Sequence, residues 1–341
     1  MRINRIAGDT YFKNLLILRD HVARSCDDFF RKLGGTKVDL YLITKSISSP
    51  MGPGSDSLPL PIKFGNQNAM LTDSSQFGME ILTLKQFDLV FCYLPSFRGE
   101  RPDDSHLNQF FHCEAEFAGN IDQAITMGNR LIRKILKDIV FAFERKRFHF
   151  ERVTFEHVTA LLSSKKTPEI TFEEAFSLLS RRRNASKLLA ITKFGRQLTR
   201  PGELELVNAV TRNRLPLWVK NFDRDVVPFY QKPSSSDSSK VLNADLLFPS
   251  VNGGFGGEVI GAGQRQDEPV EIVESLKRQK LNQKGSLEAY KWYIDLRKHP
   301  HYRTTSGFGL GVERLLAWVL CENKIEKVAV FPRKLNGDLY P

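Results

Sequence analysis

The chain has 341 residues, 41% of them hydrophobic and 25 of them phenylalanine, so it can bury a large core and is not a disordered protein. Its formal net charge of +11 favours polyanionic partners such as nucleotides or nucleic acid. The sequence contains no apolar run of about 18 residues, the length that indicates a membrane span, and its four cysteines lack metal-ligand spacing, so we expect reduced thiols in a cytoplasmic protein.

The first half of the chain predicts two long helices separated by strands. Apolar residues recur at helical spacing from Thr10 until Gly34 and Gly35 interrupt the pattern, and a second apolar stripe follows Ile121. Between the two helices, alternating segments predict strands, and a stretch rich in proline, glycine and serine predicts a loop. In chain order we expect a helix at 10–33, a strand at 38–47, a loop at 51–63, strands at 69–72 and 89–94, and a helix at 121–147.

The second half begins with a region that looks like a helical insertion at residues 148–200. A capping box, Thr171 with Glu174, introduces one of its helices. Alternating and turn-forming segments then predict short strands and a hairpin tip, and two helices follow. In chain order we expect strands at 217–219 and 226–230, a flexible tip at 232–240, a strand at 241–248, and helices at 269–280 and 286–297.

The most informative segment is the glycine-rich run from Thr305 to Gly311. Its glycines stand at alternate positions, and an apolar helix follows that carries Arg314 in its first turn. We interpret the run as a phosphate-handling turn, since a guanidinium and the positive end of a helix can hold a phosphate together. The spacing differs from GxGxxG, so it does not indicate a nicotinamide cofactor.

Three ordered motifs carry a family resemblance. The first comprises Phe97-Arg98-Gly99-Glu100, Ser105 to Phe110 and Glu114 to Phe117; the second is Gly257 to Arg265; the third is Gly307 to Arg314. Together they resemble the catalytic domain of class II aminoacyl-tRNA synthetases of the asparaginyl and aspartyl branch, over residues 10 to 332. The resemblance implies an α+β fold, an antiparallel β-sheet flanked by helices, in a single catalytic domain at 1–341.

Two further expectations follow from the same resemblance. Residues 38–47 and the following Ser49-Pro50 resemble the motif through which two subunits pair, which implies a homodimer. The anticodon-binding barrel of true synthetases is missing from the resemblance, so we expect a non-tRNA acceptor.

The resemblance also implies an ATP site with Mg²⁺. Arg98 and Arg314 would be the catalytic cations, on the α-phosphate and the γ-phosphate. Phe110 would stack on adenine, Glu100 would accept a bond from its amino group, and His106 would touch the phosphates. The remaining members of this set are Gly309 and Gly311 for ATP, and Asp245 and Glu258 for the metal. Taken one at a time, each has a structural alternative: a core aromatic for Phe110, an Arg98–Glu100 ion pair, and solvated carboxylates for the acidic pair.

The expected amino-acid pocket favours asparagine over aspartate. It comprises Ser74, Gln76, Glu80, Glu114 and Arg265, with Glu114 on the substrate ammonium and Arg265 on its side-chain oxygen. Aspartate-specific relatives carry lysine at the position of Met79. A carboxylate at Glu80 accepts a bond from an amide but repels a substrate carboxylate by about 4 kcal/mol at about 4 Å and an effective dielectric near 20.

The leading functional hypothesis is a ligase that adenylates asparagine, releases pyrophosphate, and transfers the acyl group to a small amine, ammonia or a peptide. Three alternatives remain open. The chain could be a truncated asparaginyl-tRNA synthetase that charges tRNA, an ammonia-dependent asparagine synthetase acting on aspartate, or a catalytically silent amino-acid or nucleotide sensor. Two departures from the family pattern could alter the ATP geometry: Gln109 in place of glutamate, and the glycine-rich extension at residues 252–256.

Overall fold

The chain folds into a mixed α+β structure, described by a computed structural model over residues 2–48, 58–151, 153–279, 286–337 and 339. The helices are α1 (Arg2–Gly8), α2 (Thr10–Lys32), α3 (Gln76–Leu82), α4 (Ile121–Glu144), α5 (Glu156–Ser163), α6 (Phe172–Ser180), α7 (Ala185–Leu188), α8 (Arg200–Thr211), α9 (Pro269–Arg278), α10 (Ser286–Leu296) and α11 (Val312–Val319), with 3₁₀ turns η1 (Arg224–Val226) and η2 (Ile325–Val328). The strands are β1 (Thr36–Lys37), β2 (Ile43–Thr44), β3 (Leu60–Phe64), β4 (Gln67–Leu71), β5 (Leu89–Phe97), β6 (Gln109–Ala118), β7 (Glu169–Thr171), β8 (Leu189–Thr192), β9 (Gly195–Leu198), β10 (Leu217–Lys220), β11 (Asn243–Phe248), β12 (Gly257–Gln264) and β13 (Thr305–Gly311). Within these ranges, no helix is long and apolar enough to cross a bilayer.

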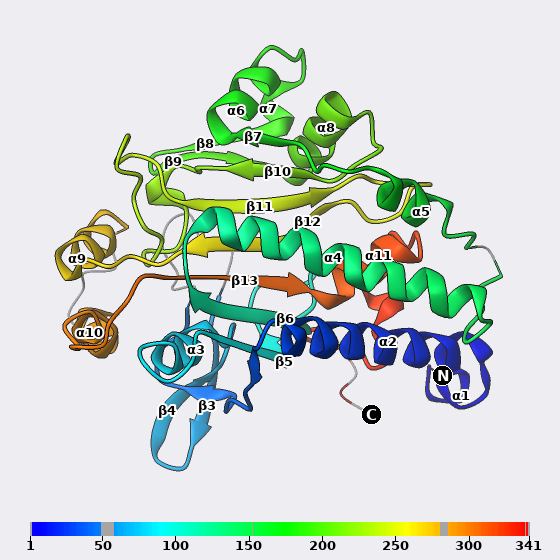
Figure 1. Ribbon diagram of the computed structural model, residues 1–341, viewed down its shortest axis with the longest axis horizontal. Helices are drawn as coiled ribbons and strands as arrows, with labels where there is room; N and C mark the ends of the chain where they lie inside the picture. Colours follow the sequence, from blue (N-terminus) through cyan, green and yellow to red (C-terminus); the bar gives the residue numbers. More distant parts are fainter. Residues whose placement is uncertain (1, 49–57, 152, 280–285, 338, 340–341) are drawn as a thin grey trace.

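A large sheet runs through the centre of the molecule (Figure 1). Within the described ranges it has eight strands, in the order β1-β5-β6-β13-β12-β11-β10-β7. All pairings between β5 and β10 are antiparallel, and only the two edge strands, β1 and β7, pair in parallel with their neighbours. The expected α+β class, with an antiparallel sheet flanked by helices, is confirmed.

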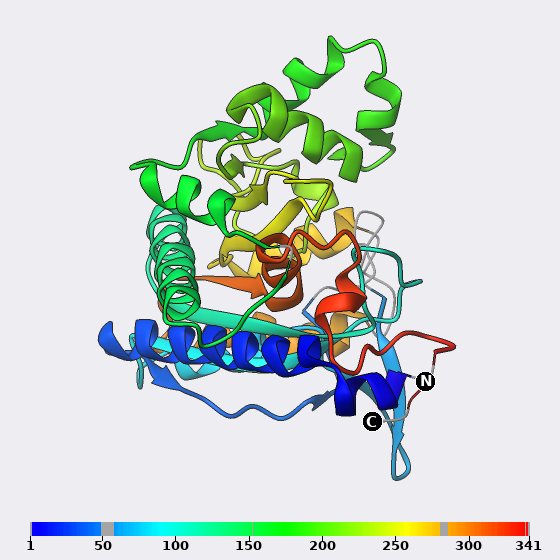
Figure 2. The same ribbon diagram turned by 90° about the vertical axis from the view of Figure 1, so that its right-hand side faces the viewer.

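Helices α2 and α4 run side by side across one face of this sheet (Figures 1 and 2). The side chain of Asp9 caps α2 by accepting from the Tyr11 N–H at 2.8 Å, and Asn120 and Gln123 form a capping box on α4. Both helices bury an apolar stripe against the sheet. In α4, Gly128 lets the ring of Trp218 approach closely, because a Cβ at that position would lie 3.3 Å from the ring. Both predicted long helices are confirmed.

The alternation of side chains along the central strands separates the helix-covered face from a polar face. On β13, Phe308 and Leu310 are buried in the core under the helices, while Gly307, Gly309 and Gly311 lie on the other face. The prediction of a turn at this run was therefore wrong. Glycines at alternate positions match the two-residue period of a strand, and α11 begins only at Val312.

Two predictions in the first half also need correction. Of the expected strand at 38–47, only residues 43 and 44 form a strand, β2, which joins a second sheet in the order β2-β4-β3, whereas β1 ends before residue 38 and pairs with β5. Within the expected loop at 51–63, residues 60–64 form β3. The proline at position 61 is tolerated because β3, among the described residues, pairs on one side only, with β4. Ser49, Pro50 and the loop residues up to 57 lie outside the described residues.

In the second half, the expected strand at 226–230 is instead a turn that follows η1. Pro228 lacks an N–H group, and its carbonyl accepts from the Gln231 N–H at 3.1 Å, which redirects the chain. The tip after it is closed by a bridge between Pro233 and Val241. The capping box at Thr171 is confirmed. Residues 148–200 hold α5, α6 and α7 but also β7, β8 and β9, so the segment is not purely helical; its status as an insertion stays a prediction.

Candidate active site

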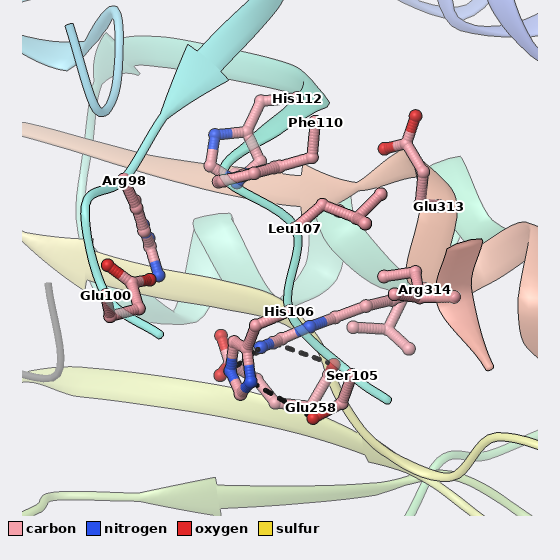
Figure 3. A pocket seen from close by; sticks show the side chains of 14 residues that line it. Arg98, Glu100, Ser105, His106, Leu107, Phe110, His112, Glu258, Glu313 and Arg314 are labelled. Carbon is pink, nitrogen blue, oxygen red and sulfur yellow. Dashed lines mark hydrogen bonds and ion pairs between the residues drawn. The ribbon is translucent and has the colours of Figure 1, made fainter. Parts of the chain in front are cut away.

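Two adjoining cavities open on the polar face of the central sheet. The first contains Arg98, His106, Phe110 and Arg314, and is drawn in Figure 3. The second contains Ser74, Gln76, Glu114, Asp245 and Arg265. Four residues line both cavities and therefore mark their junction: Arg98, His112, Glu258 and Gly309. The structure thus brings most of the predicted site residues to one continuous hollow.

The sheet register explains why this face is hollow. Glu114, Gly309, Gly261 and Asp245 are successive partners across β6, β13, β12 and β11, so they form one row on the polar face. The neighbouring row contains Glu116, Gly307, Gly263 and Asn243. In both rows the two central strands contribute glycine, which leaves a trough between acidic or amide side chains. A Cβ at Gly307 would lie 2.0 Å from Glu116 Oε2, so a larger residue there would displace the wall.

Arg98 follows the end of β5 and projects into the junction. Its guanidinium lies 5.4 Å from the centre of the Phe110 ring, and its buried Nε atom has no hydrogen-bond partner among the described residues. The Arg98 side chain makes no ion pair within the described ranges, so the alternative of a structural pair with Glu100 is not supported. Glu100 instead accepts from the Leu58 N–H at 3.3 Å. Arg98 is therefore available to an anion.

Arg314 lies opposite, in the first turn of α11, where the sequence predicted it (Figure 3). Its guanidinium donates to the Glu258 carboxylate at 3.1 Å and to His106 Nε2 at 3.0 Å. His106 Nδ1 lies 2.9 Å from Asp103 Oδ1, which fits an Nδ1–H tautomer that leaves Nε2 as an acceptor. Although burial alone would raise the pKa of Glu258, the cations of Arg314 and Arg98 hold it below its usual value. Glu258 is thus kept as a carboxylate.

Asp245 and Glu258 converge over Gly261. A Cβ at Gly261 would lie 3.1 Å from Glu258 Oε1 and 3.6 Å from Asp245 Oδ1. Burial and the neighbouring carboxylates of Glu258 and Glu203 raise the pKa of Asp245 well above its usual value. A cation between the carboxylates would relieve this repulsion. Within the described ranges no cluster of three or more His, Cys, Asp or Glu residues could hold a metal, so two carboxylates fit only an ion that takes its other ligands from substrate and water.

The second cavity is organised around Glu114. This carboxylate accepts from the Ser74 hydroxyl and, at 2.8 Å, from the Ser75 N–H. Ser74 Oγ in turn accepts from the Gln76 N–H at 3.1 Å. Burial raises the pKa of Glu114 despite these bonds. A buried carboxylate of this kind is a suitable partner for an ammonium group.

The family that matches this chain is described as tRNA synthetases class II (D, K and N), and the match covers residues 4–335. The chain belongs to this family. Membership implies ATP-dependent ligase chemistry of the aminoacyl-adenylate type.

Solved structures of synthetases share the fold of this class II family member. Asparaginyl-tRNA synthetase from Pyrococcus horikoshii, complexed with asparaginyl-adenylate, is 24% identical with a TM-score of 0.83, covering 100% of this chain and 72% of that one. Asparaginyl-tRNA synthetase from Entamoeba histolytica, in complex with asparaginyl-adenylate, is 22% identical with a TM-score of 0.79, covering 98% and 70%. Aspartyl tRNA synthetase from Entamoeba histolytica is 19% identical with a TM-score of 0.74, covering 99% and 62%.

One predicted residue of this class II synthetase domain does not reach the cavity wall. Glu80 is only 3% exposed and lines neither cavity. Its carboxylate accepts from Gln76 Nε2 at 2.8 Å, from the Tyr293 hydroxyl at 2.9 Å and from Arg297 Nη2 at 2.9 Å. The structure therefore places Glu80 behind the wall, in contact with Gln76 rather than with the cavity.

Arg265 lines the second cavity, but part of its guanidinium is already occupied. It donates to the buried carboxylate of Glu116 at 2.7 Å, and its Nε lies 4.0 Å from Glu80. Burial raises the pKa of Glu116 to about 7, although Arg265 acts in the opposite direction. The wall around Arg265 is thus a network of paired charges.

Further residues of this synthetase domain, not predicted as site residues, lie at or beside the two cavities. His112 lies at the junction, with Ser96 Oγ 3.0 Å from its Nδ1, and burial followed by the cations of Arg98 and Arg314 lowers its pKa to about 3. Glu203 accepts from the Glu258 N–H at 3.3 Å, and Gln231 lines the second cavity. The position of His112, two residues before Glu114 on the same strand face, was the one available signal; Glu203 and Gln231 had none.

Proposed function

We propose that this protein activates asparagine with ATP, forming asparaginyl-AMP and pyrophosphate, and transfers the acyl group to an amine. The observation that carries the proposal is the junction of the two cavities, where Arg98, whose Nε has no hydrogen-bond partner among the described residues, meets the row that contains Glu114. A nucleotide cavity and an amino-acid cavity that meet at a guanidinium with no ion pair among the described residues match the needs of a carboxylate attacking an α-phosphate.

In the proposed first step, ATP occupies the first cavity with its adenine on Phe110 and the edge of the base toward Glu100. Arg314 and His106 would hold the γ-phosphate, and the backbone at Gly309 and Gly311 would admit the nucleotide closely. A carboxylate oxygen of the amino acid attacks the α-phosphorus as the bond to pyrophosphate breaks. Arg98 would bridge both groups and balance the charge that develops between them.

Asp245 and Glu258 are the proposed ligands of Mg²⁺. Their convergence over Gly261 and the raised pKa of Asp245 support this role. When bound, the ion supplies positive charge to the triphosphate oxygens. Arg314 donates to Glu258 and so orders that carboxylate toward the first cavity.

For the amino acid, Ser74, Gln76 and Glu114 are the proposed ammonium site, and Arg265 is the proposed partner of the side-chain oxygen.

In the second step the nitrogen of the acceptor attacks the acyl carbon, the bond to AMP breaks, and the nitrogen loses a proton. The proposed acceptor is a small amine, ammonia or a peptide, as the sequence analysis suggested. The net charge of +11 favours tRNA as the second candidate.

The test is ATP–pyrophosphate exchange with each proteinogenic amino acid, followed by mass spectrometry of products formed with ammonia, small amines or peptides. We expect exchange with asparagine and an amide product with an amine. Exchange with aspartate and release of asparagine with ammonia would instead identify an asparagine synthetase. Acylation of tRNA alone would identify a tRNA-charging enzyme. Absence of exchange with every amino acid would leave the sensor hypothesis.

We also propose that the protein is a cytoplasmic homodimer. The free cysteines Cys26, Cys92 and Cys113 are buried, as expected for a reducing compartment. Leu16 on α2 and Phe331 expose 51% and 45% of their surface and both line a further hollow, which suits a partner subunit. Light scattering after size-exclusion chromatography tests the dimer; a monomer at micromolar concentration would contradict it.

A further inference from the structure

The wall of the second cavity contains a buried polar atom that no described residue satisfies. Gln231 is 8% exposed, and its amide oxygen has no hydrogen-bond partner among the described residues. The side chain lies directly over Gly263, since a Cβ at that position would lie 1.9 Å from this oxygen. An unpaired buried acceptor is costly, so its presence in a cavity wall points to a donor on the ligand.

The register places Gln231 at one particular end of the cavity. Along β6 and β13, the row of Glu116, Gly307 and Gly263 lies two residues beyond the row of Glu114, Gly309 and Gly261. Two residues of a strand span about 6–7 Å. The junction with the first cavity lies on the opposite side of the Glu114 row, at His112. An amino acid held by Glu114, with its carboxylate toward Arg98, would therefore extend its side chain toward Gln231.

Arg265 stands beside Gln231 at this end. The two residues are backbone partners in a β-bridge, and both line the second cavity. One offers N–H donors and the other an acceptor oxygen. A primary carboxamide has the matching groups, a carbonyl oxygen and an NH₂. The acceptor role that the sequence suggested for Glu80 is not open to it from behind the wall, where Tyr293 and Arg297 already donate to it.

Charge balance at this end also favours a neutral side chain. Arg265 and Arg297 are paired with Glu116 and Glu80 at 2.7 Å and 2.9 Å. With both carboxylates ionised, the four buried charges cancel. Among the described residues, this end of the cavity therefore has no surplus cation for the carboxylate of aspartate, which would have to be desolvated beside the amide oxygen of Gln231.

Building on the proposed function, we propose that Gln231 and Arg265 together recognise the side-chain carboxamide of the bound amino acid, Gln231 as the acceptor of its NH₂ group. Glu80 is then a positioning residue, which fixes the amide of Gln76 from behind. Selectivity for asparagine over aspartate depends on Gln231 in the first place.

The experiment measures binding of two stable adenylate analogues, asparaginyl-sulfamoyladenosine and aspartyl-sulfamoyladenosine, by calorimetry on the full chain. Binding does not require turnover, so it separates this inference from the proposed ligase activity, which the exchange assay tests. We expect the wild type to prefer the asparaginyl analogue. Gln231→Met, which conserves volume and removes the acceptor, should weaken that analogue about tenfold or more and abolish the preference.

Three further variants make the outcome decisive. Gln231→Glu keeps an acceptor and adds a charge, so it should retain the asparaginyl preference; if Gln231 instead donated its NH₂ to a carboxylate, this variant would lose binding. Gln67→Met, at an exposed position on β4, controls for the substitution and should bind as the wild type does. The inference would be overturned if Gln231→Met retained the preference for the asparaginyl analogue while Glu80→Gln lost it. It would also be overturned if the wild type preferred the aspartyl analogue or bound neither analogue.

Discussion

The guanidinium of Arg314 lies 3.1 Å from the carboxylate of Glu258, across the first cavity from Arg98. Arg314 lies on α11 and Glu258 on β12. Their contact orders a proposed phosphate ligand and a proposed metal ligand at the same time. Because Arg314 also donates to His106, its side chain is ordered before any nucleotide binds. A preorganised cation of this kind loses little conformational freedom when a phosphate arrives.

Arg314→Ala should abolish ATP–pyrophosphate exchange, and Arg314→Lys should lower it by about 10²- to 10³-fold, because a single ammonium cannot hold Glu258, His106 and a phosphate together. The far-ultraviolet circular dichroism spectrum should be unchanged in both. Arg278→Ala, which removes a surface pair with Asp225, is the matched control and should retain full exchange. Exchange retained in Arg314→Ala would show that the γ-phosphate role is misassigned.

Arg98→Ala and Arg265→Ala should separate activity from stability. Arg98 has no ion pair among the described residues, so its loss should abolish exchange with little change in the free energy of unfolding. Arg265 pairs with Glu116, which is 0% exposed, so its loss leaves a buried carboxyl without its partner and should destabilise the fold by up to about 3–5 kcal/mol at pH 8, where Glu116 is otherwise ionised. Urea denaturation of both variants checks this. Equal stability losses would contradict the assignment of Arg98 as a free cation.

The fold class and most of the site residues were predicted through the family resemblance, which rests on three motifs that are each contained in a short segment of the chain. Alternation, capping boxes and the motif spacing are all visible within segments of the chain, and Arg98, Phe110, Glu114 and Arg314 lie at such positions. The glycine-rich run was predicted to be a turn, but it forms a strand. Its period of two already contained the information that Gly307, Gly309 and Gly311 share one face of a strand.

The environment of Glu80 could not be predicted in the same way. Tyr293 and Arg297 lie more than 200 positions further along the chain, and no spacing rule links them to α3. The same holds for Gln231, whose position over Gly263 depends on the turn at Pro228 rather than on the strand expected there. Local patterns fix which residues alternate, but the partner of a buried charge depends on the completed tertiary packing.

The selectivity for asparagine over aspartate should decline as the pH falls from 8 to 6. Burial raises the pKa of Glu116 to about 7, so this carboxyl gains a proton in that range. Arg265 then carries uncompensated positive charge, which attracts the carboxylate of aspartate. Exchange assays should show kcat/KM for aspartate rising relative to that for asparagine. Glu116→Gln, which mimics the protonated form, should show the low-pH ratio at every pH; a ratio that still varies in this variant would exclude Glu116 as the cause.

Glu203→Gln should stabilise the protein, increasingly so at higher pH. Burial and the nearby carboxylate of Glu258 raise the pKa of Glu203 to about 7 in the folded protein, above its value in the unfolded chain. A carboxyl shifted in this direction contributes stability below its unfolded pKa and loses it as the pH rises through 7. The variant cannot ionise but keeps an oxygen to accept from the Glu258 N–H. At pH 8 the variant should therefore have a higher Tm than the wild type and a free energy of unfolding larger by an amount on the order of 2 kcal/mol. At pH 5 both differences should be smaller.

Glu205→Gln, on the same helix but paired with Arg182 at the surface, controls for the loss of a negative charge. A Tm difference that is the same at pH 5 and pH 8 would show that Glu203 is not held in the raised state by Glu258 and burial.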